Sequence, residues 1–148
     1  KDLVMTPEYL AKDIINHFNP TGKILDPSRG NGAFYDNYPT DNKDWCELGE
    51  NKDFLTYSEK VDWIITNPPW DRKILHPMIE HLAEQTPTWL LFDADWMHTK
   101  QAMTYLPLCR KIVSVGRVKW FGDTSGKDNC CWYLFSKQRT NDIKFYGR

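Results

Sequence analysis

The residues best suited to chemistry form the run Asn67-Pro68-Pro69-Trp70, which follows an apolar segment at residues 61–65. The segment is rich in β-formers and predicts a strand, which the two prolines end because they cannot continue a ladder. An asparagine before proline is held extended, so its amide projects beyond the strand. Carbonyl acceptors beside the flat face of Trp70 suit a planar ring that bears an amino group. A purely structural role, ending a buried strand, fits this run alone equally well.

A second candidate motif follows a short apolar strand expected at residues 23–25. It reads Asp26-Pro27-Ser28-Arg29-Gly30-Asn31-Gly32-Ala33-Phe34. The two glycines let the backbone turn tightly and approach a ligand, with amides facing outward where a helix begins near residue 33. Asp26 can accept hydrogen bonds from an ammonium group or from backbone donors. The whole pattern is far more specific than a lone Gly-x-Gly.

Two acidic residues come next in the chain. Glu47 lies near the end of a strand expected at residues 44–48, about twenty residues beyond the glycine turn, where a carboxylate suits the two hydroxyls of a ribose. Asp53 could accept from an exocyclic amine, and Phe54 could pack on a purine face. Taken in isolation, both acids fit ordinary surface charge better.

Composition indicates one globular domain of 148 residues, of which 41% are hydrophobic and seven are Trp. No apolar run reaches membrane-spanning length, and the first residues do not resemble a signal peptide. The four cysteines lack the spacing of metal ligands, so we expect no metal site and reduced thiols in an intracellular protein.

The small net charge of −1 conceals an asymmetry. Residues 1–108 hold 10 Lys and Arg against 17 Asp and Glu, whereas residues 109–148 hold 9 against 3. A basic segment on an acidic body can face phosphate groups, although a solvated lysine surface is the plain alternative. The basic residues singled out are Arg110, Lys111, Arg117, Lys119 and Lys127.

Alternating apolar segments predict the elements that position these residues. Amphipathic helices are expected at residues 6–18 and 74–82, with a shorter one at residues 99–106. The continuous apolar run at residues 89–92 predicts a strand covered on both faces. Further strands are expected at residues 112–115 and 130–135, and because no clear helix joins these two, the last should be antiparallel.

The two motifs, with Asn67 lying 41 residues after Asp26, resemble those of the amino-group methyltransferases that use S-adenosylmethionine. The match is to the adenine-N6 DNA branch, found in restriction-modification systems. Thr6-Pro7 is similar to its leading motif, and the stretch from Lys119 to the apolar run at residues 130–135 is similar to its closing hairpin. The resemblance spans nearly the whole chain. It implies a single doubly wound, Rossmann-like α/β sheet that is mostly parallel, has an antiparallel last strand and has the order 2-1-4-5-7-6.

The resemblance also implies roles for individual residues. The cofactor S-adenosylmethionine would be held by Thr6, Asp26, Pro27, Gly30, Gly32, Phe34, Glu47, Asp53 and Phe54. Asn67 and the Pro68 carbonyl would accept the two hydrogens of the target N6 amine, within a catalytic loop that also contains Pro69. Trp70 would stack on a base flipped out of the duplex. Separately from the resemblance, the basic excess of residues 109–148 leads us to expect DNA contacts from Arg117, Lys119, Trp120, Phe121 and Lys127.

The sequence departs from the family pattern in two ways. Only five residues separate Glu47 from Asp53, so strand 3 is expected to be missing or vestigial. No part of the 148 residues is left for a target-recognition domain, so a homodimer or a partner protein would supply sequence recognition.

The same chemistry could serve an RNA base or a protein glutamine, or the chain could be a non-catalytic subunit. The implied location is the cytoplasm of a bacterium or of a virus-infected bacterium.

Overall fold

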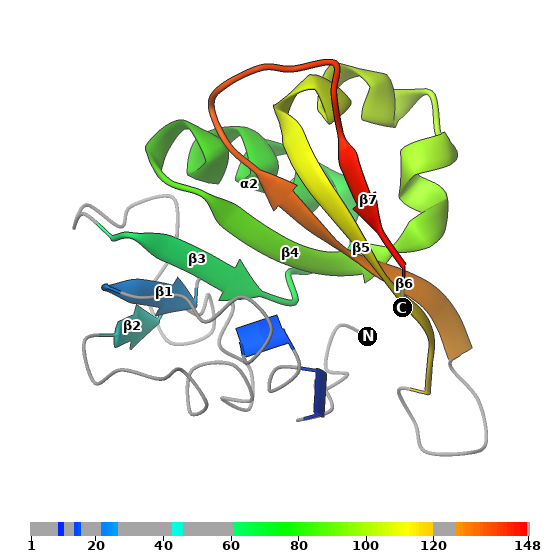
Figure 1. Cartoon of the computed structure of the whole chain (residues 1–148), viewed down its shortest axis with the longest axis horizontal. Coiled ribbons are helices and arrows are strands. Elements are labelled where there is room, and N and C mark those ends of the chain that lie inside the picture. Colours follow the sequence, from blue (N-terminus) through cyan, green and yellow to red (C-terminus); the bar gives the residue numbers. More distant parts are fainter. Residues whose placement is uncertain are drawn as a thin grey trace.

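Seven strands form one mixed sheet in the computed structural model (Figure 1). The structure describes residues 9–10, 14–15, 22–26, 43–45, 61–119 and 127–147. In chain order, the strands are β1 (Ile24–Asp26), β2 (Lys43–Trp45), β3 (Trp63–Thr66), β4 (Thr88–Asp93), β5 (Cys109–Lys119), β6 (Lys127–Phe135) and β7 (Lys144–Tyr146). Within the part of the chain that the structure describes, the helical elements are α2 (Arg72–Gln85) and three short 3-10 segments, η4 (Ala94–His98), η5 (Gln101–Thr104) and η6 (Leu106–Leu108), and residues 9–10 and 14–15 are also helical.

The strands lie in the order β2-β1-β3-β4-β6-β5-β7. The strands β1 to β4 are parallel, β6 is antiparallel to both of its neighbours, and β7 pairs parallel with β5. The expected class, a mostly parallel α/β sheet with one reversed strand near the chain end, is therefore confirmed.

The strand count and order differ from the prediction because β7 extends the sheet beyond β5. This strand has only three residues, two of them exposed, which is too little hydrophobic pattern to predict a strand from sequence. The reversed strand is consequently not the last in the chain. The expectation that strand 3 is missing or vestigial concerns residues 46–60, which lie outside the described residues.

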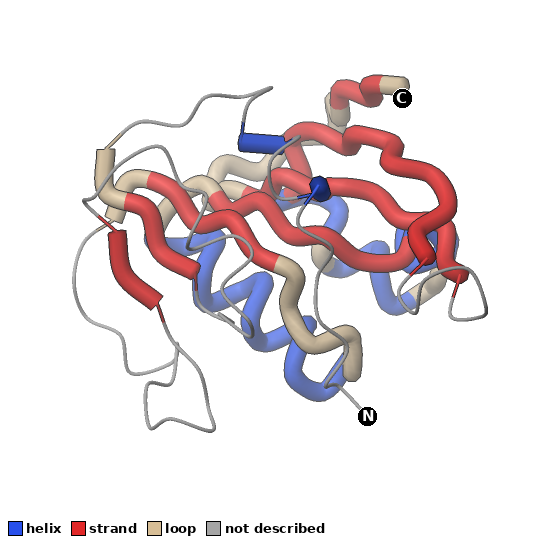
Figure 2. The backbone as a smooth tube through the Cα atoms, turned by 90° about the horizontal axis from the view of Figure 1, so that it is seen from below, coloured by secondary structure: helices blue, strands red, loops and turns tan. Residues whose placement is uncertain are grey.

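Strand β4 lies at the centre of the sheet and contributes to hydrophobic clusters on both faces. Trp89 and Leu91 join one cluster, with Leu10, Ile14 and Ile15 of the N-terminal helical residues. Leu90 and Phe92 join a second cluster, which includes Leu75, Ile79 and Ala83 of α2. Figure 2 shows α2 and the 3-10 segments together below the sheet. The predicted two-sided burial of β4 is confirmed.

The segment between β4 and β5 differs from the single helix expected at residues 99–106. It forms three short 3-10 turns, with Pro107 inside the last of them. Strand β5 also differs, since it has 11 residues, whereas the strand expected there spans only residues 112–115. Register shifts between Cys109 and Lys111 and between Ser114 and Gly116 mark irregularities that bend this strand.

The β5–β6 hairpin continues beyond the end of β4. Asp93, the last residue of β4, pairs with Cys130, and three more β5–β6 pairs follow from Arg117 to Lys119. These pairs lie past the carboxyl end of β4, at the lower right of Figure 1. The hairpin therefore projects from the edge at which parallel α/β sheets bind their ligands.

Candidate active site

Asp26 and Asn67 stand at the carboxyl ends of two adjacent parallel strands. Asp26 ends β1, and Asn67 follows directly after β3, which pairs with β1 through Leu25 and Ile64. From β1 the chain leads to β2 on one side of β1, while β3 lies on the other side. The strand order thus reverses between these two residues, and open α/β sheets bind ligands in the crevice at such a switch point.

The Asp26 side chain is completely buried. Its Oδ1 accepts a hydrogen bond from the Thr66 hydroxyl at 2.6 Å, so the last residue of β3 orients the carboxylate that ends β1. A buried carboxylate needs polar partners of this kind, because removing it from water without them is costly. This arrangement provides an oriented carboxyl group at the switch point.

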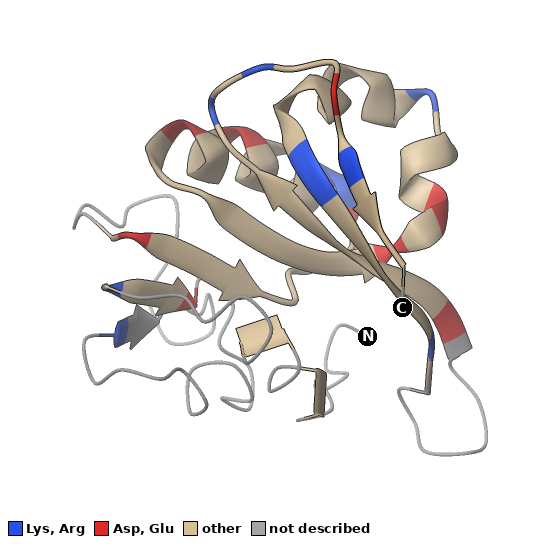
Figure 3. Cartoon of the chain, viewed as in Figure 1, with Lys and Arg blue, Asp and Glu red and all other residues tan. Residues whose placement is uncertain are grey.

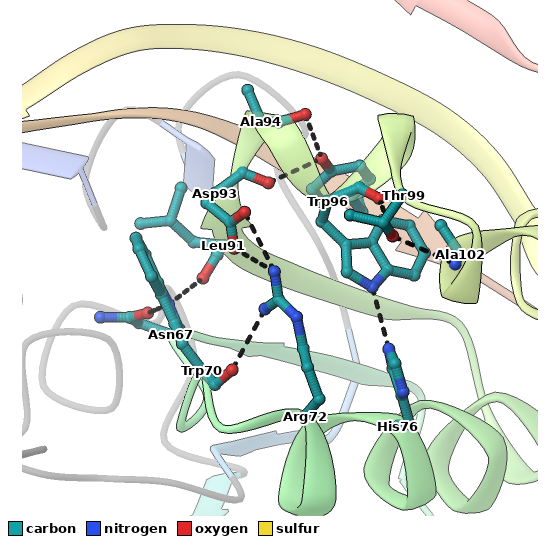
Figure 4. Close-up of polar contacts among 11 residues, drawn as sticks. Asn67, Trp70, Arg72, His76, Leu91, Asp93, Ala94, Trp96, Thr99 and Ala102 are labelled. Atoms are coloured by element: carbon teal, nitrogen blue, oxygen red, sulfur yellow. Dashed lines mark hydrogen bonds and ion pairs between the residues drawn. The ribbon is translucent and has the colours of Figure 1, made fainter.

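Asn67 and Trp70 are joined across the Pro-Pro turn (Figure 4). The Trp70 indole Nε1 donates to Asn67 Oδ1 at 3.0 Å and to the Leu91 carbonyl at 3.2 Å. Pro68 between them is buried, and Pro69 is half-buried. The loop is therefore fixed to strand β4 through a side chain, although its prolines offer no backbone N–H for pairing.

Arg72 supports the same loop from the start of α2. Asp71 caps this helix by accepting from the Lys73 amide at 3.0 Å, which places Arg72 in the first turn. The Arg72 Nη1 donates to the Trp70 carbonyl at 3.1 Å, and its Nη2 forms an ion pair with Asp93. The run at residues 67–70 is consequently held at both its side-chain and its backbone groups.

His76 and Trp96 are buried side by side and form a structural cluster with the half-buried Tyr105. The Trp96 indole donates to His76 Nε2 at 3.0 Å, and the imidazole stacks on Tyr105 with the ring centroids 4.4 Å apart. Burial, with the nearby charge of Arg72, lowers the pKa of His76 and keeps its ring neutral. The sequence offered no signal for this cluster, because His76 lies 20 residues before Trp96 and 29 before Tyr105.

The buried cysteines provide no reactive thiol. Burial raises the pKa of Cys109 to about 12 and that of Cys131 to about 11, and it also raises the pKa of Cys130. Protonated, buried thiols are poor nucleophiles and poor metal ligands. Within the described ranges, no group of three His, Cys, Asp or Glu residues is placed to hold a metal ion.

The basic residues of the C-terminal part divide into two locations. Arg117 is exposed on the projecting hairpin, where Lys119 pairs with Lys127. Lys111 instead pairs with Lys144 of β7. At the usual rise per residue of a strand, Lys111 lies about 20 Å from Arg117 along β5. Figure 3 shows the basic positions of β5 and β7 at that far end. Arg110 and Lys111 are thus not grouped with the hairpin cations, contrary to the single basic segment expected from the sequence.

Several predicted site residues cannot be placed relative to this framework. Those that lie outside the described residues are Thr6, Pro27, Gly30, Gly32, Phe34, Glu47, Asp53, Phe54, Trp120 and Phe121. Of the predicted site, the structure brings Asp26 and the run at residues 67–70 to the same edge of the sheet.

Comparison with known proteins identifies the fold. No protein-family model and no curated protein matches the sequence. Among solved structures, PH1948 from Pyrococcus horikoshii, a protein proposed to be an RNA methyltransferase, matches with a TM-score of 0.67 at 14% identity, over 93% of this chain and 89% of that one. A dimethyladenosine transferase from Plasmodium falciparum matches with a TM-score of 0.60 at 15% identity, over 90% and 63% of the two chains.

The M protein of the type I restriction enzyme EcoKI matches with a TM-score of 0.63 at 11% identity, over 97% of this chain but only 48% of that one. This chain therefore spans about half of the larger protein. In the described residues, no helix has the length and apolar character needed to cross a membrane. The chain has the fold shared by these methyltransferases.

Proposed function

We propose that this chain is a methyltransferase that uses S-adenosylmethionine to methylate the N6 amine of adenine in DNA. The observation that carries the proposal is the position of Asp26 and the Asn67 loop at one topological switch point. The methyltransferase fold of the solved neighbours supports it independently.

The described residues fit the cofactor at its amino-acid end. S-adenosylmethionine, when bound, supplies a methyl group on a sulfonium that is already a good leaving group. The buried Asp26 carboxylate is a suitable acceptor for the ammonium of a methionine moiety. Glycines 30 and 32 would approach that moiety with their backbone, Glu47 would bind the ribose, and Asp53 with Phe54 would bind the cofactor's adenine.

Asn67 and the carbonyl of Pro68 would act on the target amine. Both are hydrogen-bond acceptors, so together they could bind the two N6 hydrogens of a flipped-out adenine. Accepting both hydrogens polarises the nitrogen and directs its lone pair away from the two acceptors. The Thr66–Asp26 and Trp70–Asn67 hydrogen bonds support this assignment, because preorganised polar groups lower a barrier without reorganising during the reaction.

The projecting β5–β6 hairpin would contact the nucleic acid. Arg117, Lys119 and Lys127 lie on it, beyond the carboxyl end of β4 and hence on the side of the sheet where Asn67 lies. Trp120 and Phe121, which follow β5 in the sequence, would add apolar contacts. A second copy of the chain or a partner subunit would supply sequence recognition, and the restriction-enzyme M protein among the neighbours favours DNA.

An RNA base is the second candidate substrate. It is favoured by PH1948, which is proposed to be an RNA methyltransferase. That protein matches this chain with a TM-score of 0.67 over 89% of its own length. A protein glutamine would require the same acceptor pair but no basic hairpin.

The deciding experiment offers labelled S-adenosylmethionine with duplex DNA, single-stranded DNA, RNA and protein to the purified chain. The DNA is then digested, and the labelled nucleoside is identified by mass. We expect the labelled nucleoside released from DNA to be N6-methyl-2′-deoxyadenosine. Label found only in RNA or only in protein glutamine would show that DNA is not the substrate. No transfer to any of the substrates would favour the alternative that the chain is a non-catalytic subunit.

A further inference from the structure

The Trp70 indole is fixed in the structure by two independent sets of contacts. Its ring packs against both hydrophobic clusters of the sheet. Its Nε1–H is shared between Asn67 Oδ1 at 3.0 Å and the Leu91 carbonyl at 3.2 Å. Leu91 is itself completely buried in β4, so its carbonyl is a fixed acceptor. One indole N–H thus connects the central strand of the sheet to the side chain of Asn67 (Figure 4).

We infer that Trp70 is a positioning residue that determines which end of the Asn67 amide is presented as the acceptor, an inference that rests on the proposed function. An asparagine amide has an oxygen and an NH₂ group of nearly the same size, and only the oxygen can accept a hydrogen from an amine. The indole N–H is a donor only, so it selects the orientation with Oδ1 toward itself.

The selected orientation is compatible with the proposed reaction. A carboxamide oxygen has two lone pairs, so an oxygen that accepts from the indole keeps the chemical capacity to accept a hydrogen of the target amine as well. In Figure 4 the Asn67 nitrogen points away from the indole, as this arrangement requires.

This role differs from stacking on the base, which the sequence predicts for the same residue. Stacking needs only the aromatic face of Trp70, whereas positioning needs its N–H. The two roles therefore separate on replacement by phenylalanine, which keeps an aromatic ring and removes the donor. Trp70→Ala removes both.

The test compares Trp70→Phe, Trp70→Ala, Asn67→Ala and the double variant Trp70→Phe/Asn67→Ala with the parent chain. Single-turnover methyl transfer from labelled S-adenosylmethionine to an oligonucleotide gives the rate, and fluorescence anisotropy gives the affinity for that oligonucleotide. Trp96→Phe is the matched control, because it also removes an indole hydrogen bond, to His76 at 3.0 Å, away from Asn67. Thermal unfolding of every variant identifies any that do not fold.

We expect Trp70→Phe to lower the transfer rate about tenfold, as for the loss of one polar contact, with oligonucleotide affinity within about twofold of the parent. In the Asn67→Ala background the same change should have almost no further effect on the rate, because there is no amide left to orient. Trp96→Phe should reduce thermal stability but leave the rate per folded molecule unchanged. Parent-like turnover of Trp70→Phe, or an undiminished tenfold loss in the Asn67→Ala background, would overturn the inference.

A readout that needs no activity keeps this inference separate from the proposed function. The indole N–H signal of Trp70 can be assigned by its loss from the nitrogen-proton spectrum of Trp70→Phe. We expect this signal to shift and its exchange with solvent to accelerate in Asn67→Ala, but not in Asn141→Ala, which alters an exposed asparagine. If the parent chain methylates nothing, the proposed function fails, and this spectrum alone decides the inference: an unmoved signal in Asn67→Ala refutes it.

Discussion

Arg72 and Asp93 are joined by one guanidinium nitrogen that contacts both carboxylate oxygens, at 3.0 and 3.1 Å. The other terminal nitrogen of Arg72 binds the Trp70 carbonyl at 3.1 Å. The pair therefore connects the end of β4 to the start of α2 and to the turn that carries Asn67. Tyr133 supports this position from β6, since its hydroxyl donates to the Asp93 carbonyl at 2.9 Å.

A double-mutant cycle with Arg72→Met and Asp93→Asn should give a coupling free energy of about 1 kcal/mol, measured by urea unfolding. The pair makes two contacts, but its side chains are 30% and 21% exposed, so solvent screens part of the attraction. Lys73→Met, next to Arg72 on the exposed side of α2, is the control and should not couple to Asp93→Asn. A coupling within about 0.3 kcal/mol of zero for the Arg72 pair would show that it contributes nothing to stability.

Asn67→Ala should lower methyl transfer by about a hundredfold or more, the usual effect of losing one preorganised polar contact in an active site. The affinity for S-adenosylmethionine, measured by calorimetry, should remain nearly unchanged. Asn141→Ala is the matched control at an exposed position and should retain the parent rate. Near-normal turnover of Asn67→Ala would remove this residue from the mechanism.

Asp26→Asn should weaken S-adenosylmethionine binding at least tenfold, because it removes the charge that attracts the ammonium while preserving the shape of the side chain. The Thr66 hydroxyl can still donate to the amide oxygen, so the fold should be retained. Calorimetry with Asp142→Asn, which alters an exposed carboxylate, provides the comparison. Equal affinities of the two variants would contradict the assignment of Asp26 to the cofactor.

Protonation of His76 should destabilise the protein at mildly acidic pH. Burial lowers the pKa of His76 in the folded chain below its ordinary value of 6.5, and its Nε2 must stay unprotonated to accept from Trp96. The unfolded chain binds this proton more readily, so stability is complete above pH 6.5 and decreases as the pH falls from 6.5 toward the lowered pKa.

Urea unfolding at several values between pH 8 and pH 5 measures this dependence. His76→Gln keeps an acceptor but does not titrate, so the slope of stability against pH should be reduced in this variant. His81→Gln, which changes another histidine of α2, is measured beside it for comparison. The interpretation fails if His76→Gln and the parent lose stability in parallel.

Oligonucleotide binding should weaken steeply with salt if the hairpin contacts phosphates. Replacing Lys119 or Lys127 by alanine should each lower the slope of log affinity against log salt by about one, because one fewer counterion is released. Lys144→Ala, on β7 at the far end of the sheet, should leave the slope unchanged. A flat salt dependence would mean that the hairpin is only a solvated surface.

The sequence was sufficient for the features that depend on local pattern. The continuous apolar run at residues 89–92 predicted a strand buried on both faces, and the prolines after Asn67 marked the end of β3 correctly. Features that depend on tertiary contacts were not predictable. The Arg72–Asp93 pair and the Trp96–His76 pair join residues about 20 positions apart, and no spacing rule relates them.

The same limit applies to the roles of Trp70 and of the basic residues. An aromatic residue after Pro-Pro predicts a stacking surface, but the shared indole hydrogen bond becomes visible only once β3 and β4 are paired. Likewise, the charge excess of residues 109–148 did not show that strand β5 separates Lys111 from Arg117 by most of its length.

Strand β6 lies between β4 and β5 although β5 precedes it in the chain. During synthesis, β5 therefore emerges before β6, the strand that connects it to β4. Until residue 135 is available, β4 presents an unpaired edge that carries the apolar run from Trp89 to Phe92. Open apolar strand edges pair readily with other chains, so the incomplete chain, rather than the finished protein, is the species most exposed to aggregation.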